Sequence, residues 1–64
     1  MIEYWAIIAT NHIEHDLMKA ASVCQTEERM HQLATEYMRQ GYKNITWNVF
    51  AQKSKATDFI SKSY

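Results

Sequence analysis

Apolar residues recur with a helical period between residues 27 and 40, which predicts an amphipathic helix. The members of this apolar stripe are Met30, Leu33, Ala34, Tyr37 and Met38. Thr26 precedes the stripe as an N-cap. Glu27 and Glu28 follow Thr26 in the first turn, where the helix dipole favours negative charge. Gly41 fits the left-handed position that ends a helix, and Tyr42 can make the apolar contact that accompanies a Schellman ending.

The period changes to two after the helix, which predicts a strand over residues 45–52. One face of this strand carries Ile45, Trp47, Val49 and Ala51, and the other carries Thr46, Asn48, Phe50 and Gln52. We expect the first set to meet the helix, so that Trp47 and Val49 belong to the core. Residues 44–52 contain no proline and no charge, and such an edge strand is open to pairing with another chain.

A six-residue apolar run occupies residues 4–9 and predicts a strand that is apolar on both faces. Tyr4 and Ile8 point to one face, and Trp5 and Ile7 point to the other. Runs of this kind are typical of a central strand that is buried on two sides.

Residues 11–25 fit two structures. As a helix, they would start with Asn11 and Glu14 in capping-box spacing. As a hairpin, "NHIEHD" forms a polar turn and residues 17–25 pair back on the first strand. The hairpin is favoured, because two strands joined only by helices would leave a thin, two-stranded sheet.

The predicted fold class is α+β: a small β-β-α-β domain with strand order 2-1-3 and one helix packed on one face of the sheet. The alternative is β-α-α-β. Residues 1–64 form a single domain in either case, and residues 53–64 are a tail that is either loosely attached or folded back. Within the tail, Lys53 and Lys55 suggest an exposed break, and Phe59 and Ile60 suggest a small apolar anchor that a short helix would carry.

One helix leaves the opposite face of the sheet uncovered, and we expect Trp5 and Ile7 to lie on that face near Phe50. Leaving such side chains in water forgoes about 1.5–3 kcal/mol each, which is a large loss for a small domain. Three partners could cover this apolar face: the tail through Phe59, Ile60 and Tyr64, a second copy of the chain, or a different protein.

Composition narrows the class of protein. Cys24 is the single cysteine among 64 residues, so an intrachain disulfide is excluded and a reducing compartment fits best. No segment approaches the ~20 apolar residues of a membrane span, so we expect a cytoplasmic protein with no membrane partner. The net charge is zero, with −4 over residues 1–36 and +4 over residues 37–64.

Little in the sequence indicates catalysis. His12 and His15 lie near acidic residues, but no paired metal-ligand spacing accompanies them, so no metal site is predicted. A phosphate-binding loop cannot form with one glycine. A chain of this size also has little room for a ligand pocket. We therefore predict no enzyme activity, no catalytic residues and no cofactor.

The remaining prediction is a protein-binding module that uses a sheet edge and the helix-free face. Its expected contact residues are Trp5, Ile7, Thr46, Asn48 and Phe50, with Lys53 and Lys55 at the rim. The partner would be a larger protein or a second copy of the chain. The alternative is a homodimeric nucleic-acid-binding protein that uses the basic C-terminal half.

An aromatic-rich first strand, a threonine-capped helix and a closing strand within 64 residues give a layout similar to that of the small RNA-polymerase inhibitors of T7-type bacteriophages. The resemblance concerns layout and assigns no residue. It implies a compact protein, encoded by a phage or another mobile element, that docks on a larger protein and inhibits it.

Overall fold

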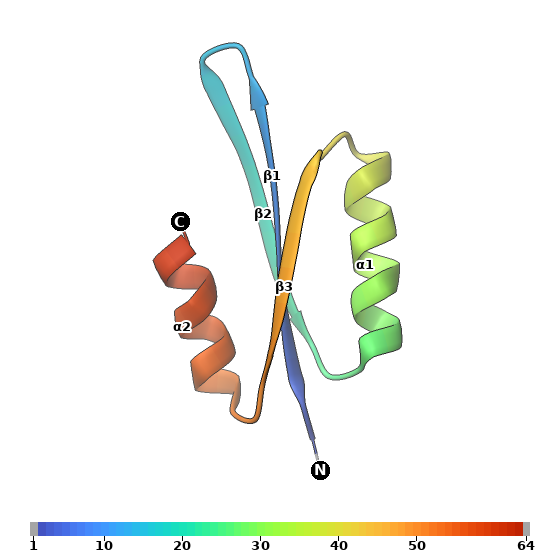
Figure 1. The fold of residues 1–64 in the computed structure, drawn as a ribbon, viewed down its shortest axis with the longest axis vertical. Helices are drawn as coiled ribbons and strands as arrows, with labels where there is room; N and C mark the ends of the chain where they lie inside the picture. The colour runs from blue at the N-terminus through green and yellow to red at the C-terminus, as the bar shows by residue number, and fades with distance from the viewer. Residues whose placement is uncertain (1, 64) are drawn as a thin grey trace.

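The computed structural model describes residues 2–63, which form three strands and two helices (Figure 1). The elements in chain order are β1 (Tyr4–Ile13), β2 (Asp16–Cys24), α1 (Glu27–Arg39), β3 (Asn44–Phe50) and α2 (Lys53–Ser63). The two helices lie on opposite sides of the sheet.

The sheet has the order β2-β1-β3, and β1 pairs antiparallel with both neighbours. The predicted α+β class, the β-β-α-β succession and the strand order are therefore confirmed. The alternative of a helix within residues 11–25 is wrong, because Asp16–Cys24 is a strand paired with β1. The two strands meet in a two-residue turn formed by Glu14 and His15.

Both ends of α1 are closed as the sequence predicts. The Thr26 side chain accepts a hydrogen bond of 3.1 Å from the backbone N–H of Arg29. At the other end Gly41 has φ +104°, and its N–H donates to the Met38 carbonyl at 3.1 Å. The Tyr42 N–H donates to the Tyr37 carbonyl at 3.1 Å, which completes a Schellman motif.

A cluster of buried apolar residues lies between α1 and the sheet. Its buried members are Ile7, Ala9, Cys24, Met30, Ala34 and Tyr37. The Tyr37 hydroxyl is 2.6 Å from the hydroxyl of Ser22 on β2, and its ring meets the Tyr42 ring edge-on with centroids 5.6 Å apart. Tyr37 therefore ties α1 to β2 and also to the chain that leaves the helix.

The prediction of a single helix and a helix-free second face is wrong, because α2 covers that face. This helix packs mainly on β1 and also on β3. Ala56 of this helix is fully buried, and the rings of Phe59 and Phe50 pack with centroids 5.5 Å apart. Of the three covers considered, the fold-back of the tail through Phe59 is the one observed.

The chain breaks at Ala51 and Gln52, which are bends, and not at the predicted Lys53–Lys55 segment. Lys53 and Lys55 lie in the first turn of α2 instead, and both are exposed. Tyr64, the third residue expected to anchor the tail, lies outside the described residues.

Replacing Gly41 by alanine is expected to lower the free energy of unfolding by about 1 kcal/mol. A Cβ at this position would meet no atom within 4 Å, so the cost comes from the left-handed backbone alone. Urea denaturation measures the change. Gln40→Ala, at the neighbouring residue with φ −79°, is the control and should cost clearly less.

Phe59→Ala is expected to lower the free energy of unfolding by about 2 kcal/mol, because the ring is half-buried against Phe50. Asp58→Ala changes an exposed position of the same helix and should have little effect. Thermal unfolding of both variants compares them directly. Equal stability of Phe59→Ala and the natural chain would show that α2 does not stabilise the sheet.

Candidate functional site

The two helices do not cover the sheet evenly. On one face α1 packs on β1 and β2, and on the other α2 packs on β1 and β3. The side of β3 that faces α1 therefore has little cover. Trp47 and Val49 lie on this side and are 47% and 39% exposed, whereas Ile45 is half-buried against the core. We call Ile45, Trp47 and Val49 the β3 strip.

The prediction that Trp47 and Val49 belong to the core is wrong. Their alternation was assigned correctly, because they do share the face of the sheet on which α1 lies. Alternation alone does not reveal their exposure, because α1 packs on β1 and β2 and leaves β3 with little cover. An uncharged edge strand with two large apolar residues on one face was the signal that could have identified them.

The predicted contact residues do not share one face. Trp5 and Ile7 point to the α1 side, where Ile7 is fully buried and Trp5 is packed against the core. Thr46, Asn48 and Phe50 point to the α2 side, since strand residues alternate. The placement of Trp5 and Ile7 on a helix-free face beside Phe50 is therefore wrong.

Two of the predicted residues do lie at an accessible edge. Thr46 and Asn48 are exposed on β3, whereas Phe50 is half-buried beneath Phe59. Lys53 and Lys55 follow on α2 and are exposed, so they can still form a rim at the end of the strand. The structure thus brings Thr46 and Asn48 next to the β3 strip, which projects from the opposite face of the same strand.

The hairpin turn determines which backbone groups of β3 point away from the sheet. A two-residue turn is flanked by a pair that exchanges both backbone hydrogen bonds, here Ile13 and Asp16. Odd-numbered residues of β1 then bond to β2, and even-numbered ones bond to β3. Their β3 partners are also even-numbered, because Ile8 pairs with Thr46. The N–H and C=O groups of the β3 strip therefore point outward.

A side-chain hydrogen bond agrees with this assignment. The backbone N–H of Val49 donates to Oδ1 of the neighbouring Asn48 at 2.9 Å. An outward donor at a sheet edge needs such a local partner or water, whereas a donor in the ladder has a strand partner. Asn48 thus occupies one outward donor of β3.

The two edges of the sheet differ in their protection. β2 carries Asp16 and Lys19, and charged residues on an edge strand discourage pairing with other chains. β3 carries no charge and no proline over its seven residues. A hollow of about 380 Å³ continues its apolar surface at the strand end, lined by Ile2, Glu3, Val49, Phe50 and Ala51. β3 is the less protected edge.

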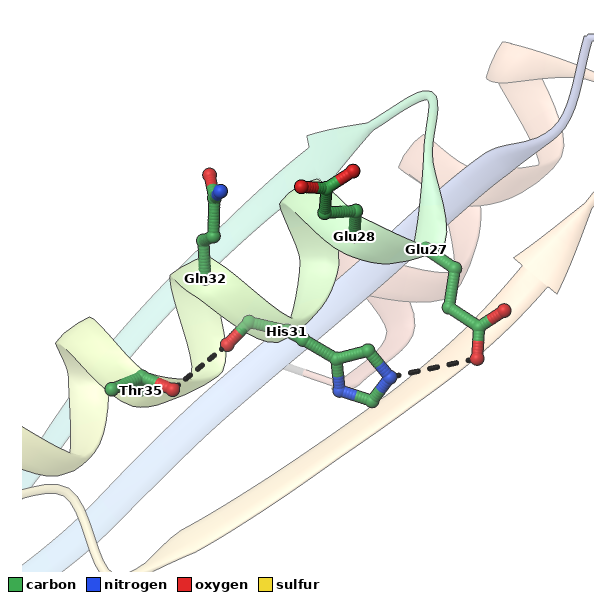
Figure 2. Close-up of a pocket in the computed structure, with 5 residues that line it drawn as sticks. All are labelled: Glu27, Glu28, His31, Gln32 and Thr35. Atoms are coloured by element: carbon green, nitrogen blue, oxygen red, sulfur yellow. Dashed lines mark hydrogen bonds and ion pairs between the residues drawn. The ribbon is translucent and has the colours of Figure 1, made fainter.

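The outer surface of α1 carries a shallow depression (Figure 2), which is lined by Glu27, Glu28, His31, Gln32 and Thr35. Nε2 of His31 is 3.5 Å from Oε1 of Glu27, and both side chains are exposed. The Thr35 hydroxyl donates to the His31 carbonyl within the helix. These contacts are local to α1 and leave no buried polar group that would orient a substrate.

His31 also connects α1 to the β3 strip. Its ring meets the ring of Trp47 edge-on, with centroids 6.3 Å apart. Glu27 and His31 extend from the side of the helix that faces β3 (Figure 2). The β3 strip is therefore bordered by a polar pair on one side and by the open strand edge on the other.

The residues considered for chemistry do not come together. His12 and His15 are exposed at the end of the hairpin, while Cys24 is buried beside α1. Among residues 2–63, no three histidine, cysteine or acidic side chains gather as metal ligands would. Burial raises the pKa of the Cys24 thiol, and the Thr26 backbone and the Arg29 charge offset this only in part.

No protein-family model matches the chain, and neither a curated protein nor a solved structure is significantly similar to it. Within residues 2–63, neither helix is long and apolar enough to cross a membrane. Functional assignment therefore depends on the chain's own surface.

Cys24 is expected to react slowly with iodoacetamide in the folded chain, because its raised pKa keeps the thiol protonated. Unfolding in urea should restore the rate of an ordinary thiol. Equal alkylation rates with and without urea would contradict this prediction.

The same raised pKa predicts how stability depends on pH. A thiol with a raised folded-state pKa favours folding below its unfolded pKa, and this contribution is lost as pH rises through the folded value. Stability should therefore fall at alkaline pH, by less in Cys24→Ala. An equal fall in Cys24→Ala would contradict this explanation of the pH dependence.

Proposed function

We propose that this protein is a non-enzymatic protein-binding module that takes up an extended segment of another polypeptide along β3. The observation that carries the proposal is the coincidence of two features on one strand. The backbone groups of the β3 strip point outward, and the side chains of Trp47 and Val49 in the same strip are exposed. An added strand would form hydrogen bonds with these backbone groups and cover these side chains.

Strand addition would provide both affinity and orientation. The backbone ladder supplies hydrogen bonds that any extended chain can make. Trp47 and Val49 add apolar area, and covering the exposed half of such side chains is worth about 1 kcal/mol each. Thr46 and Asn48 would contact the incoming segment on the α2 side, and Lys53 and Lys55 would lie at its rim.

A larger protein that offers a free sheet edge or an extended loop is a suitable partner. Occupying that edge would block whatever else uses it, which gives the module a means of inhibition without any chemistry of its own. The shallow, exposed surface of α1 is consistent with this view, since it provides no enclosed space for a reaction.

The nucleic-acid alternative has weaker support. Single-strand binding needs aromatic faces that are free to stack on bases beside a basic groove. Phe50 and Phe59 lie on the basic α2 side, but their rings pack against each other. Trp47 is exposed on the other face, where its neighbour His31 is paired with the acidic Glu27.

Asn48→Lys is expected to abolish capture of a partner, because it places a charge on the strand edge. The tagged chain and this variant serve as baits, and mass spectrometry compares the retained proteins. A candidate retained only by the natural chain is then purified and titrated against both baits. At least a tenfold loss of affinity is expected, equal to about 1.4 kcal/mol.

His15→Lys is the matched control, because it adds a lysine in the exposed hairpin turn, beyond the end of β3. It should retain the same partner as the natural chain. If the two lysine variants retain the same proteins with the same affinity, the β3 edge is not the binding surface.

A further inference from the structure

We infer that the strand which β3 accepts is β3 of a second copy of this chain, aligned antiparallel around a two-fold axis at Trp47. This inference rests on the proposed function, because it names the polypeptide that occupies the edge. It predicts a symmetric dimer in which two three-stranded sheets join into one sheet of six strands.

The residue pattern of β3 is nearly symmetric about Trp47. Thr46 and Asn48 flank it as polar residues, and Ile45 and Val49 come next as β-branched aliphatic residues. Antiparallel pairing around Trp47 therefore places Ile45 opposite Val49 of the second copy and Thr46 opposite its Asn48. Every pair within this span joins residues of one kind, and the two-fold axis repeats each pair on the other side of Trp47.

The backbone groups match in the same register. The three residues whose N–H and C=O point outward are those of the β3 strip, and this pairing sets each of them against another member of the strip. Such pairs exchange two hydrogen bonds each, giving about six across the dimer. A register shifted by one residue would oppose outward groups to inward groups and break the ladder.

The same register buries the apolar surface that α1 leaves open. A two-fold axis normal to the sheet puts both β3 strips on the same face, side by side. Trp47 of each copy then meets its counterpart, and each Val49 meets an Ile45. The exposed parts of Trp47 and Val49 are thus covered by Trp47 and Ile45 of the second copy.

Charge does not oppose this pairing. β3 itself is uncharged, so no like charges face each other along the ladder. At the strand ends, Lys43 of one copy lies opposite Ala51 of the other. On α1, the Glu27–His31 pair borders the β3 strip, and its two members lie 3.5 Å apart, so the Glu27 carboxylate of each copy sits beside a histidine of its own helix.

Light scattering coupled to gel filtration tests the association. The natural chain should give twice the monomer mass of 7.6 kDa, with dissociation on dilution. Asn48→Lys should raise the dimer dissociation constant about tenfold or more. Asn48→Ala should lower it, because the Val49 N–H is released from its side-chain partner. His15→Lys should leave it unchanged.

Oxidative cross-linking tests the register, because Thr46 and Asn48 of opposite copies are paired but like residues are not. Thr46→Cys and Asn48→Cys should each form little disulfide alone, since diagonal Cα atoms are about 8 Å apart and out of reach. An equimolar mixture should form a disulfide-linked dimer. The natural chain is the control for the buried Cys24 and should remain unlinked.

Three outcomes would overturn the inference: a monomer at every concentration up to about 0.5 mM, a dimer that Asn48→Lys does not weaken, or equal cross-linking of the separate cysteine variants and their mixture. The first outcome would leave the proposed function standing if Asn48→Lys still loses another captured protein. A dimer with the expected register, combined with no other protein retained in the capture experiment, would limit the function to self-association.

Discussion

The fold depends on covering both faces of one strand. Residues 6–9 of β1 are buried, and their side chains alternate between the two faces of the sheet. One helix on one face would leave Ala6 and Ile8 in water, so α2 is as necessary to this sheet as α1. A sheet of three strands is roughly 14 Å wide and a helix about 10 Å, so one helix per face leaves part of each face uncovered. An open strip follows from these dimensions.

Side-chain size determines which part is left open on the α1 side. β2 presents Ala20, Ser22 and Cys24 to α1, which are small and allow close approach, and the hydroxyl of Tyr37 bonds to Ser22. β3 presents the larger Ile45, Trp47 and Val49 instead. The helix therefore settles toward β2 and meets β3 at the edge-on contact of His31 with Trp47. On the other face, the Phe50–Phe59 contact holds α2 near β3.

Because α1 lies toward β2, it leaves apolar side chains exposed on β3, the strand whose outward N–H and C=O groups are open to pairing. Trp47 and Val49 would be unremarkable as isolated exposed residues, which are common on soluble proteins. Here they belong to the residues whose N–H and C=O point away from the sheet. A single added strand can therefore satisfy hydrogen bonds and cover side chains together. The β2 edge lacks this combination, since Asp16 and Lys19 lie along it.

The sequence by itself determined the ends of α1 and the central place of β1, and the strand order followed once residues 11–25 were taken as a hairpin. Thr26 and Gly41 set the ends of α1 through backbone geometry, and the two-sided apolar run of residues 4–9 required a central strand. It indicated at most a short helix around Phe59 and Ile60, because these two residues form too short an apolar pattern to predict the whole of α2. Only the tertiary structure decided which helix faces the odd-numbered residues of β1 and how far across the sheet α1 lies. Alternation defines two faces of a strand, but the exposure of Trp47 depends on the lateral position of a helix, which is set by contacts between segments distant in sequence.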